Sequence, residues 1–334
     1  MFLRRVVEMQ VERKALYNLL RMNWLLDPSI KVLAWQVEDY RALPVFEIFN
    51  RLQAKHVDLD KVSFTALAEH CDNSEDLTDE LVEGSEISQE DEDQIYLLLF
   101  ELWRRLIPEK PSLSTFCDEL DHQIYLYDQG NLDQEEGIQD VLANLQVILD
   151  ENVDGGGKPL EVFELVTNTC ANDIESFLYD FIAEQIDHHN YSYASELIEG
   201  FQKYIKDEKW FEFLTTRILA VTDSHGANQQ VRQLTKKIMA KPDLEFIFEI
   251  LTFLVQDGEK EAFVKLAKKG VSLLQTEEDF RDLLLISSDF FHHLDLEKQE
   301  DAIKKILQAR HRKSIAEHVK AQDSDVQQFV KILE

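Results

Sequence analysis

Two pairs of adjacent histidines are the residues whose side chains could do chemistry most directly. One pair is His188 and His189, which follow Asp187, and the other is His292 and His293, which lie between Asp289 and Asp295. Imidazoles beside carboxylates can bind zinc, iron or manganese, so each pair is a candidate metal site. Neighbouring residues of a helix point about 100° apart, however, and rarely give both rings to one ion. Both pairs also fall at predicted helix C-termini, where histidine caps free carbonyl groups, and we favour that role.

No recognisable catalytic motif accompanies these histidines. A carboxylate-bridged di-iron site needs two Glu-x-x-His motifs, and the chain has one, Glu119 to His122. The patterns of zinc proteases, serine hydrolases and dinucleotide-binding folds are absent. Cys71, Cys117 and Cys170 lie 46 and 53 residues apart, which predicts reduced, buried thiols rather than a disulfide framework or a metal-ligand set. We therefore expect no cofactor. An all-α metal-dependent enzyme with its site near a histidine pair is the alternative.

The chain is strongly acidic, and the charge is concentrated in one part of it. Thirty-five Lys and Arg against 65 Asp and Glu give a formal net charge of −30 at pH 7. Residues 62–157 hold 25 acidic and three basic side chains, and the stretch 69–93 has twelve acidic residues and no Lys or Arg. Such a surface repels nucleic-acid phosphates and anionic membranes. We expect a basic protein partner and no direct binding of nucleic acid or membrane.

One side of a short predicted helix in this stretch carries five carboxylates. They are Glu75, Asp76, Asp79, Glu80 and Glu83. Three interpretations stay open: an ordinary solvated surface, a recognition face for a basic partner, or an acidic mimic of the nucleic-acid phosphate backbone. Mimicry requires carboxylates spaced regularly along one rigid face, which the pattern permits without favouring it.

Aromatic side chains gather around one predicted helical hairpin. They include Tyr191, Tyr193 and Trp210, followed by Phe211 and Phe213. Aromatic residues are enriched in binding hot spots, and they equally fill the space between packed helices. Tyr191, Tyr193 and Trp210 are therefore candidates for partner binding, with core packing as the alternative.

The one locally basic stretch lies near residue 310. It contains Arg310, His311, Arg312, Lys313 and Lys320. It predicts either a solvated last helix or a surface that docks on the acidic part of the chain. Because that docking could involve a second copy, the sequence is compatible with a homo-oligomer.

The elements that must position these residues are helices. Apolar residues recur at helical spacing in nearly every segment, as in Ile138, Val141, Leu142, Leu145, Ile148 and Leu149. Ser88 with Asp91 predicts a capping box, and Asp27 before Pro28 predicts a helix start. Pro44, Pro159 and Pro242 predict further starts, and Gly84, Gly130 and Gly270 predict ends. No run of residues alternates as a strand would. The sequence predicts an all-α fold.

A glycine cluster marks the clearest candidate boundary. Residues 152–159 read Asn-Val-Asp-Gly-Gly-Gly-Lys-Pro, at the end of the acidic part. A phosphate-binding loop would need Ser or Thr after the lysine and a strand before the loop, so we interpret the cluster as a linker. This predicts an N-terminal helical domain at 1–152, a linker at 153–158 and a C-terminal helical-repeat domain at 159–334.

The C-terminal half shows a weak internal repeat. Three alanines open the second helices of predicted hairpins, each with a large apolar residue four positions later: Ala194 with Ile198, Ala262 with Leu266, and Ala302 with Ile306. Their spacings are 68 and 40 residues, and 68 is twice the 34-residue period of tetratricopeptide repeats. Residues 172–310 thus resemble degenerate tetratricopeptide hairpins. The family's glycine is replaced by Ile182, Ile250 and Phe290, and a hairpin midway between the first two would place Asn228 at the small position.

This resemblance implies stacked helical hairpins, an α-solenoid-like array that binds other proteins. We therefore expect a non-enzymatic protein–protein interaction module, such as an adaptor, scaffold or chaperone-like protein, whose acidic surface suits a basic partner.

The N-terminal segment has charges every few residues and no apolar core of a signal peptide. The longest apolar runs are too short to span a bilayer. We expect a cytoplasmic protein.

Overall fold

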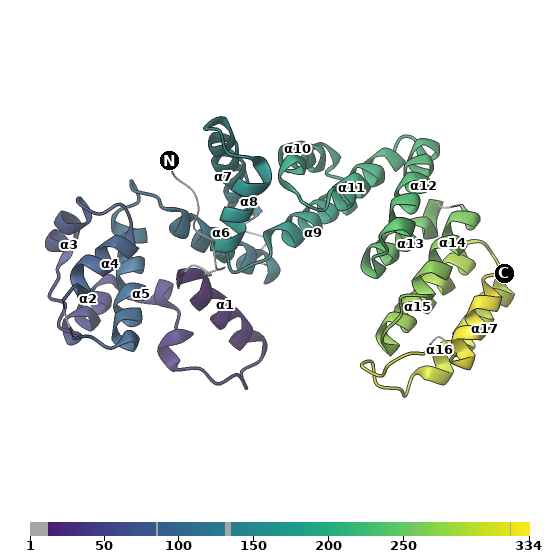
Figure 1. The fold of residues 1–334 in the computed structure, drawn as a ribbon, viewed down its shortest axis with the longest axis horizontal. Coiled ribbons are helices and arrows are strands. Elements are labelled where there is room, and N and C mark those ends of the chain that lie inside the picture. Colours follow the sequence, from purple (N-terminus) through teal and green to yellow (C-terminus); the bar gives the residue numbers. More distant parts are fainter. Residues whose placement is uncertain (1–12, 85, 131–134, 258, 321) are drawn as a thin grey trace. The chain divides into compact units, whose positions relative to one another are not determined.

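The computed structural model describes residues 13–84, 86–130, 135–257, 259–320 and 322–334. In these residues the chain forms seventeen α-helices joined by short loops and 3₁₀ turns, and it contains no strand beyond one isolated bridge between Thr276 and His318 (Figure 1). The all-α prediction is confirmed. Helical periodicity succeeded because most helices bury one apolar stripe, such as the one from Ile138 to Leu149 in α7.

The helices divide between two compact units, one ending at Leu178 and the other running from Tyr179 to Glu334. α9 (Ile174–Asp187) contains the boundary. The first unit holds α1 (Arg13–Leu26), α2 (Val45–Ala54), α3 (Lys61–Ala68), α4 (Ser74–Val82), α5 (Gln89–Leu106), α6 (Leu113–Asp128), α7 (Glu135–Asp154) and α8 (Pro159–Thr169).

This division differs from the boundary that the glycine cluster predicts. The cluster forms the tight turn between α7 and α8, two helices that pack together. Gly156 has a φ of +103°, and a Cβ on Gly157 would lie 2.6 Å from the Val162 side chain. Glycine is needed here for the turn geometry, which the sequence alone does not distinguish from a linker.

Several predicted helix ends are right and others are wrong. Ser88 caps α5 by accepting the Asp91 N–H at 3.1 Å, and Pro159 opens α8. Gly84 and Gly130 end α4 and α6 with positive φ angles. Gly270 instead lies inside α14 (Lys260–Val271). Asp27 is also wrong, because its carboxylate binds the Ser29 N–H and hydroxyl in a turn that follows α1.

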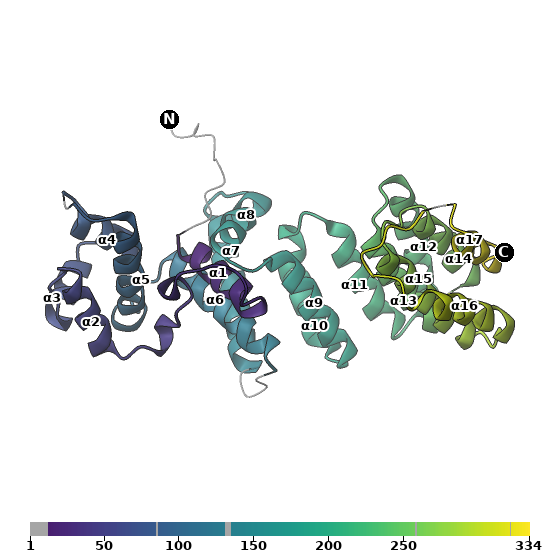
Figure 2. The same cartoon turned by 90° about the horizontal axis from the view of Figure 1, so that it is seen from below.

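The second unit is built of successive hairpins. α11 (Glu208–Ala220) pairs with α12 (Ser224–Ala240), α13 (Leu244–Asp257) with α14, and α15 (Glu277–His293) with α16 (Glu297–Arg310) (Figures 1 and 2). Their first helices contact one another, α11 with α13 and α13 with α15. α10 (Tyr191–Phe201) contacts α9 through Tyr193 and Phe181, and α17 (Ser324–Ile332) packs on α14 and α16.

The alanines of the weak repeat lie in second helices of these hairpins. Ala194 is in α10, Ala262 in α14 and Ala302 in α16. In α12 the small and large residues are Ala227 and Val231, both 1% exposed and one position before the expected register. The four alanines are thus 33, 35 and 40 residues apart, and the loop lengths, not a missing hairpin, break the sequence register.

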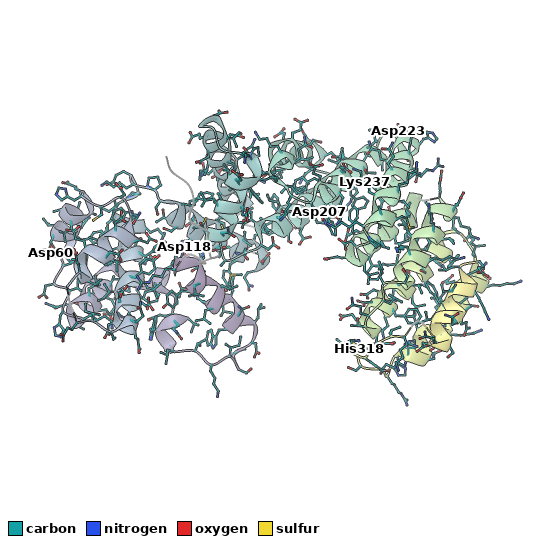
Figure 3. All side chains as sticks on the ribbon, viewed as in Figure 1. Asp60, Asp118, Asp207, Asp223, Lys237 and His318 are labelled. Carbon is teal, nitrogen blue, oxygen red and sulfur yellow. The ribbon has the colours of Figure 1, made fainter. Side chains whose placement is uncertain are left out.

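The predicted basic stretch has a structural role at its first residue. Arg310 is 1% exposed, and its guanidinium binds the carboxylates of Glu277, Asp323 and Asp325. The Arg310 side chain therefore ties α15 and the start of α17 to α16, and it is not a solvated residue. His318, labelled in Figure 3, lies in the segment closed by this cluster.

Candidate binding groove

A hollow in the second unit lies between α9, α11 and α13, and we call it the α9–α11–α13 groove. Its volume is about 640 Å³, within the range of roughly 300–1,000 Å³ typical of ligand sites. Its lining residues come from these three helices, from the turn after α9, from the start of α10 and from the C-cap of α11: Ile186, Asp187, His189, Tyr191, Phe213, Arg217, Ala220, Val221, Glu249, Thr252, Phe253 and Gln256.

Two helical stripes make most of the lining. On α13, Glu249, Thr252, Phe253 and Gln256 follow the i, i+3, i+4, i+7 pattern of one helix face. The opposite residues of α13, among them Ile250 and Leu254, are completely buried. On α11 and its C-cap, the stripe is Phe213, Arg217, Ala220 and Val221. α13 thus packs by one face and lines the groove with another, whereas the α11 stripe begins at Phe213, which is 1% exposed and belongs to the core.

Packed aromatic rings hold these helices in place. Trp210 lies between Tyr179 and Phe246, with ring centroids 4.8 and 4.6 Å away. Phe213 meets Phe246 and Phe253 edge-on, at 5.8 and 5.7 Å. Such pairs add about 0.5–1.5 kcal/mol each beyond area burial, so the groove has a rigid apolar side.

The charged groups of the lining are two carboxylates and one guanidinium. Arg217 Nη2 lies 2.5 Å from Asp187 Oδ1 and forms an ion pair with it. Glu249 Oε2 accepts a hydrogen bond from the Tyr179 hydroxyl at 3.1 Å. Burial raises the pKa of Tyr179, and Glu249 raises it further, so the phenol stays protonated and donates. Among the described residues, no cation pairs with Glu249.

Only one of the three predicted aromatic candidates lines the groove. Tyr191 does so, and its hydroxyl lies 2.7 Å from His189 Nδ1. Tyr193 packs edge-on against Phe181 at 6.2 Å, and Trp210 belongs to the aromatic packing described above. The sequence could not separate these roles, because all three residues are aromatic and lie near the same hairpin.

The histidine pairs lie at helix C-termini, as their spacing predicts. His188 and His189 follow α9, and His189 has a φ of +64°, the left-handed conformation that ends many helices. His292 and His293 end α15, and His292 Nδ1 lies 3.2 Å from Glu300 Oε2. Within the described part of the chain, no group of three or more His, Cys, Asp or Glu side chains could hold a metal ion.

The five acidic candidates lie on or just after α4, and they are not equivalent. Asp76, Asp79, Glu80 and Glu83 are exposed and have no ion-pair partner among the described residues. Glu75 is half-buried and accepts hydrogen bonds from the Tyr96 hydroxyl, at 2.8 Å, and from Ser74. The exposed acidic face of α4 therefore has four carboxylates, not five, and this departs from the regular spacing that mimicry requires.

Neighbouring carboxylates of the acidic stretch are neutralised. Lys55 Nζ lies 2.7 Å from Asp91, and Arg13 pairs with both Glu92 and Asp93. These bases come from before the acidic stretch, so no local pattern indicates the pairing. The unpaired charge is concentrated at α4.

A buried ion cluster in the first unit is a feature that the sequence did not reveal. Asp118, labelled in Figure 3, lies on α6 and accepts contacts from Lys14 at 2.8 Å, Arg41 at 2.5 Å and Asn18 at 3.0 Å. Burial alone would raise the pKa of Asp118, but the two cations outweigh it and hold the pKa well below its usual range. The cluster borders a hollow of about 70 Å³, room for about two water molecules.

Asp121, one turn further along α6, is buried without a cation. Its carboxylate accepts the N–H groups of Ala171 and Asn172 at 2.9–3.0 Å and the Asn172 amide at 2.8 Å. Burial raises the pKa of Asp121 despite these hydrogen bonds. Burial and Arg41 lower the pKa of His122, the next residue. These groups fasten α6 to α1 and to the segment after α8.

Comparisons with known proteins identify no relative. No family model, no curated protein and no solved structure matches the chain. No helix in the described part of the chain is long and apolar enough to cross a membrane.

Proposed function

We propose that the protein is a non-enzymatic protein–protein interaction module that holds a segment of a basic partner in the α9–α11–α13 groove. The observation that carries this proposal is the groove itself. It joins an apolar aromatic side to a carboxylate without a counter-ion. A hollow with a few convergent polar groups is the default form of a binding site.

Two further observations support a binding array. The recurrence of an alanine in α10, α12, α14 and α16 supports tetratricopeptide-like hairpins, although only Ala194 and Ala227 are buried. Helical repeats use the surface of successive hairpins to hold partner chains. The exposed face of α4 adds long-range attraction for a basic protein. We propose a cytoplasmic adaptor, scaffold or chaperone-like role on this basis.

Site-specific photo-cross-linking tests this function. A photoreactive amino acid replaces Thr252, an exposed groove residue, or Leu285, which is 50% exposed on α15 and outside the groove. We expect one protein of a source-cell lysate to cross-link at position 252 and not at 285. Equal labelling at both positions, or none at 252, would show that the groove is not a partner site.

A further inference from the structure

We infer that the groove contains a subsite for one lysine or arginine side chain of the bound segment, formed by Glu249 and Phe253. This inference rests on the proposed function and adds the chemistry of the ligand. Of the three charged groups that line the groove, Arg217 and Asp187 pair with each other, and Glu249 has no partner of opposite charge in the described part of the chain.

Glu249 is the unneutralised group. Arg217 forms its ion pair with Asp187 and not with Glu249. The nearby Lys209 lies 2.6 Å from Asp207 and 2.8 Å from Asp243, and it is likewise engaged. A cation that reaches a carboxylate without a counter-ion is favoured over a neutral group.

Hydrogen bonding fixes where that cation must arrive. The Tyr179 hydroxyl occupies Glu249 Oε2, and Oε1 has no hydrogen-bond partner in the described residues. Tyr179 is itself clamped against Trp210 at 4.8 Å, so the carboxylate is held in a set orientation. An arriving ammonium or guanidinium therefore meets a preorganised acceptor, which reduces the entropic cost of binding.

The aromatic rings beside Glu249 suit the same ligand. Phe253 is one turn further along α13, partly exposed in the groove. Phe213 is 1% exposed and supports the Phe253 ring edge-on from the core, at 5.7 Å. The alkyl stem of lysine or arginine packs on a ring such as Phe253, and its charged end gains cation–π attraction to it. A carboxylate ligand would face repulsion from Glu249, and an aliphatic one would leave Glu249 without a counter-ion.

Selected peptides test the inference. Short random peptides displayed on phage are selected on the full chain, and an enriched peptide is synthesised with its lysine or arginine kept, or replaced by norleucine or by glutamate. Calorimetry then measures the affinity of each peptide for the wild-type chain, for Glu249→Gln and for Glu245→Gln. Glu245 is an exposed control on the same helix, outside the groove.

We expect norleucine to weaken binding to the wild type and to Glu245→Gln by about tenfold, and to have little effect on Glu249→Gln. Equal binding of the lysine and norleucine peptides, or the same loss on Glu249→Gln, overturns the subsite but leaves the groove as a binding site. If no peptide is enriched, or if every enriched peptide binds Thr252→Arg as tightly as the wild type, both the subsite and the proposed function are overturned.

Discussion

The two compact units place their charge in opposite ways. In the first unit, a buried carboxylate, Asp118, is surrounded by cations, and the exposed carboxylates of α4 face water. In the second, a buried cation, Arg310, is surrounded by carboxylates, and Glu249 stays half-buried in the groove. A buried carboxylate thus fastens helices, and we propose that the exposed ones attract a partner from a distance and that the half-buried one discriminates between ligands.

Removing the buried cation of the second unit should have the largest effect. Arg310→Met leaves Glu277, which is completely buried, without its main partner. We expect a loss of about 3–5 kcal/mol in the free energy of unfolding, measured by urea denaturation. Arg312→Met, at an exposed position in the same stretch, is the control and should change little. Equal stability of the two variants would mean that Arg310 does not hold the end of the array.

Removing the buried carboxylate of Asp118 in the first unit should lower the free energy of unfolding by less than Arg310→Met does, and the loss should depend on pH. Asp118→Asn leaves Lys14 unpaired, whereas Arg41 keeps Glu119 at 2.9 Å, so we expect a loss of about 3 kcal/mol at pH 7. The pKa of Asp118 is lowered by folding, so its stabilisation is present above the unfolded value near 4 and is lost as pH falls below it. Acid denaturation should therefore be shallower in Asp118→Asn than in the wild type.

The contribution of Asp121 to stability should depend on pH with the opposite sign. Its pKa is raised in the folded state, so its ionisation opposes folding and this cost disappears as pH falls. Asp121→Asn should therefore steepen the loss of stability in acid, measured by the same titration. A shallower loss would contradict the pKa direction of Asp121.

Filling the groove should abolish binding without unfolding the chain. Thr252→Arg places a guanidinium one turn from Glu249 and neutralises it from within the protein. We expect about a hundredfold loss of affinity for a selected peptide, equal to about 2.7 kcal/mol, measured by calorimetry. Thr215→Arg, on an exposed position of α11 outside the lining, should bind normally. Equal binding by both variants would show that the peptide does not bind in the groove.

Reversing the exposed face of α4 should have the smallest effect. Lysine at Asp76, Asp79, Glu80 and Glu83 should slow association with a basic partner by about tenfold at low salt and leave it unchanged at high salt, measured by stopped flow. Glu75→Gln should instead alter stability, because Glu75 binds Tyr96. A salt-independent loss in the reversed variant would indicate a direct contact in place of long-range attraction.

The sequence predicted what depends on neighbouring residues. The helical period gave the all-α fold, and Ser88 and Pro159 marked true helix starts, because caps and stripes act within one or two turns. Asp27 failed because a carboxylate before proline closes a turn by binding Ser29 as readily as it caps a helix. The glycine cluster lies in the turn between α7 and α8, and its composition did not reveal this because a tight turn and a linker share one composition.

The groove and the buried clusters could not be predicted, because they join residues distant in sequence. Glu249 lies 70 residues from Tyr179, and Asp118 lies 100 residues from Asn18. On α13 the polar residues Glu249, Thr252 and Gln256 interrupt an otherwise apolar helix, and this spacing was the one local signal of an open face. Only α11 and α9 opposite it make that face a groove.

The ion pairs of Arg310 affect which helices of the second unit unfold together. α17 has nine residues, too few to hold a helix in water by itself. Its buried Val326 and Phe329 pack in the core, and the Arg310 guanidinium joins it to α15 and α16. The backbone of the closing segment also bonds to the start of α15, through Val319 N–H to Gln275 and Glu277 N–H to Glu317. Amides of α17 should therefore exchange with solvent at the rate of α15 and α16, so that these three helices form one cooperative unit instead of a stable pair with a fraying end.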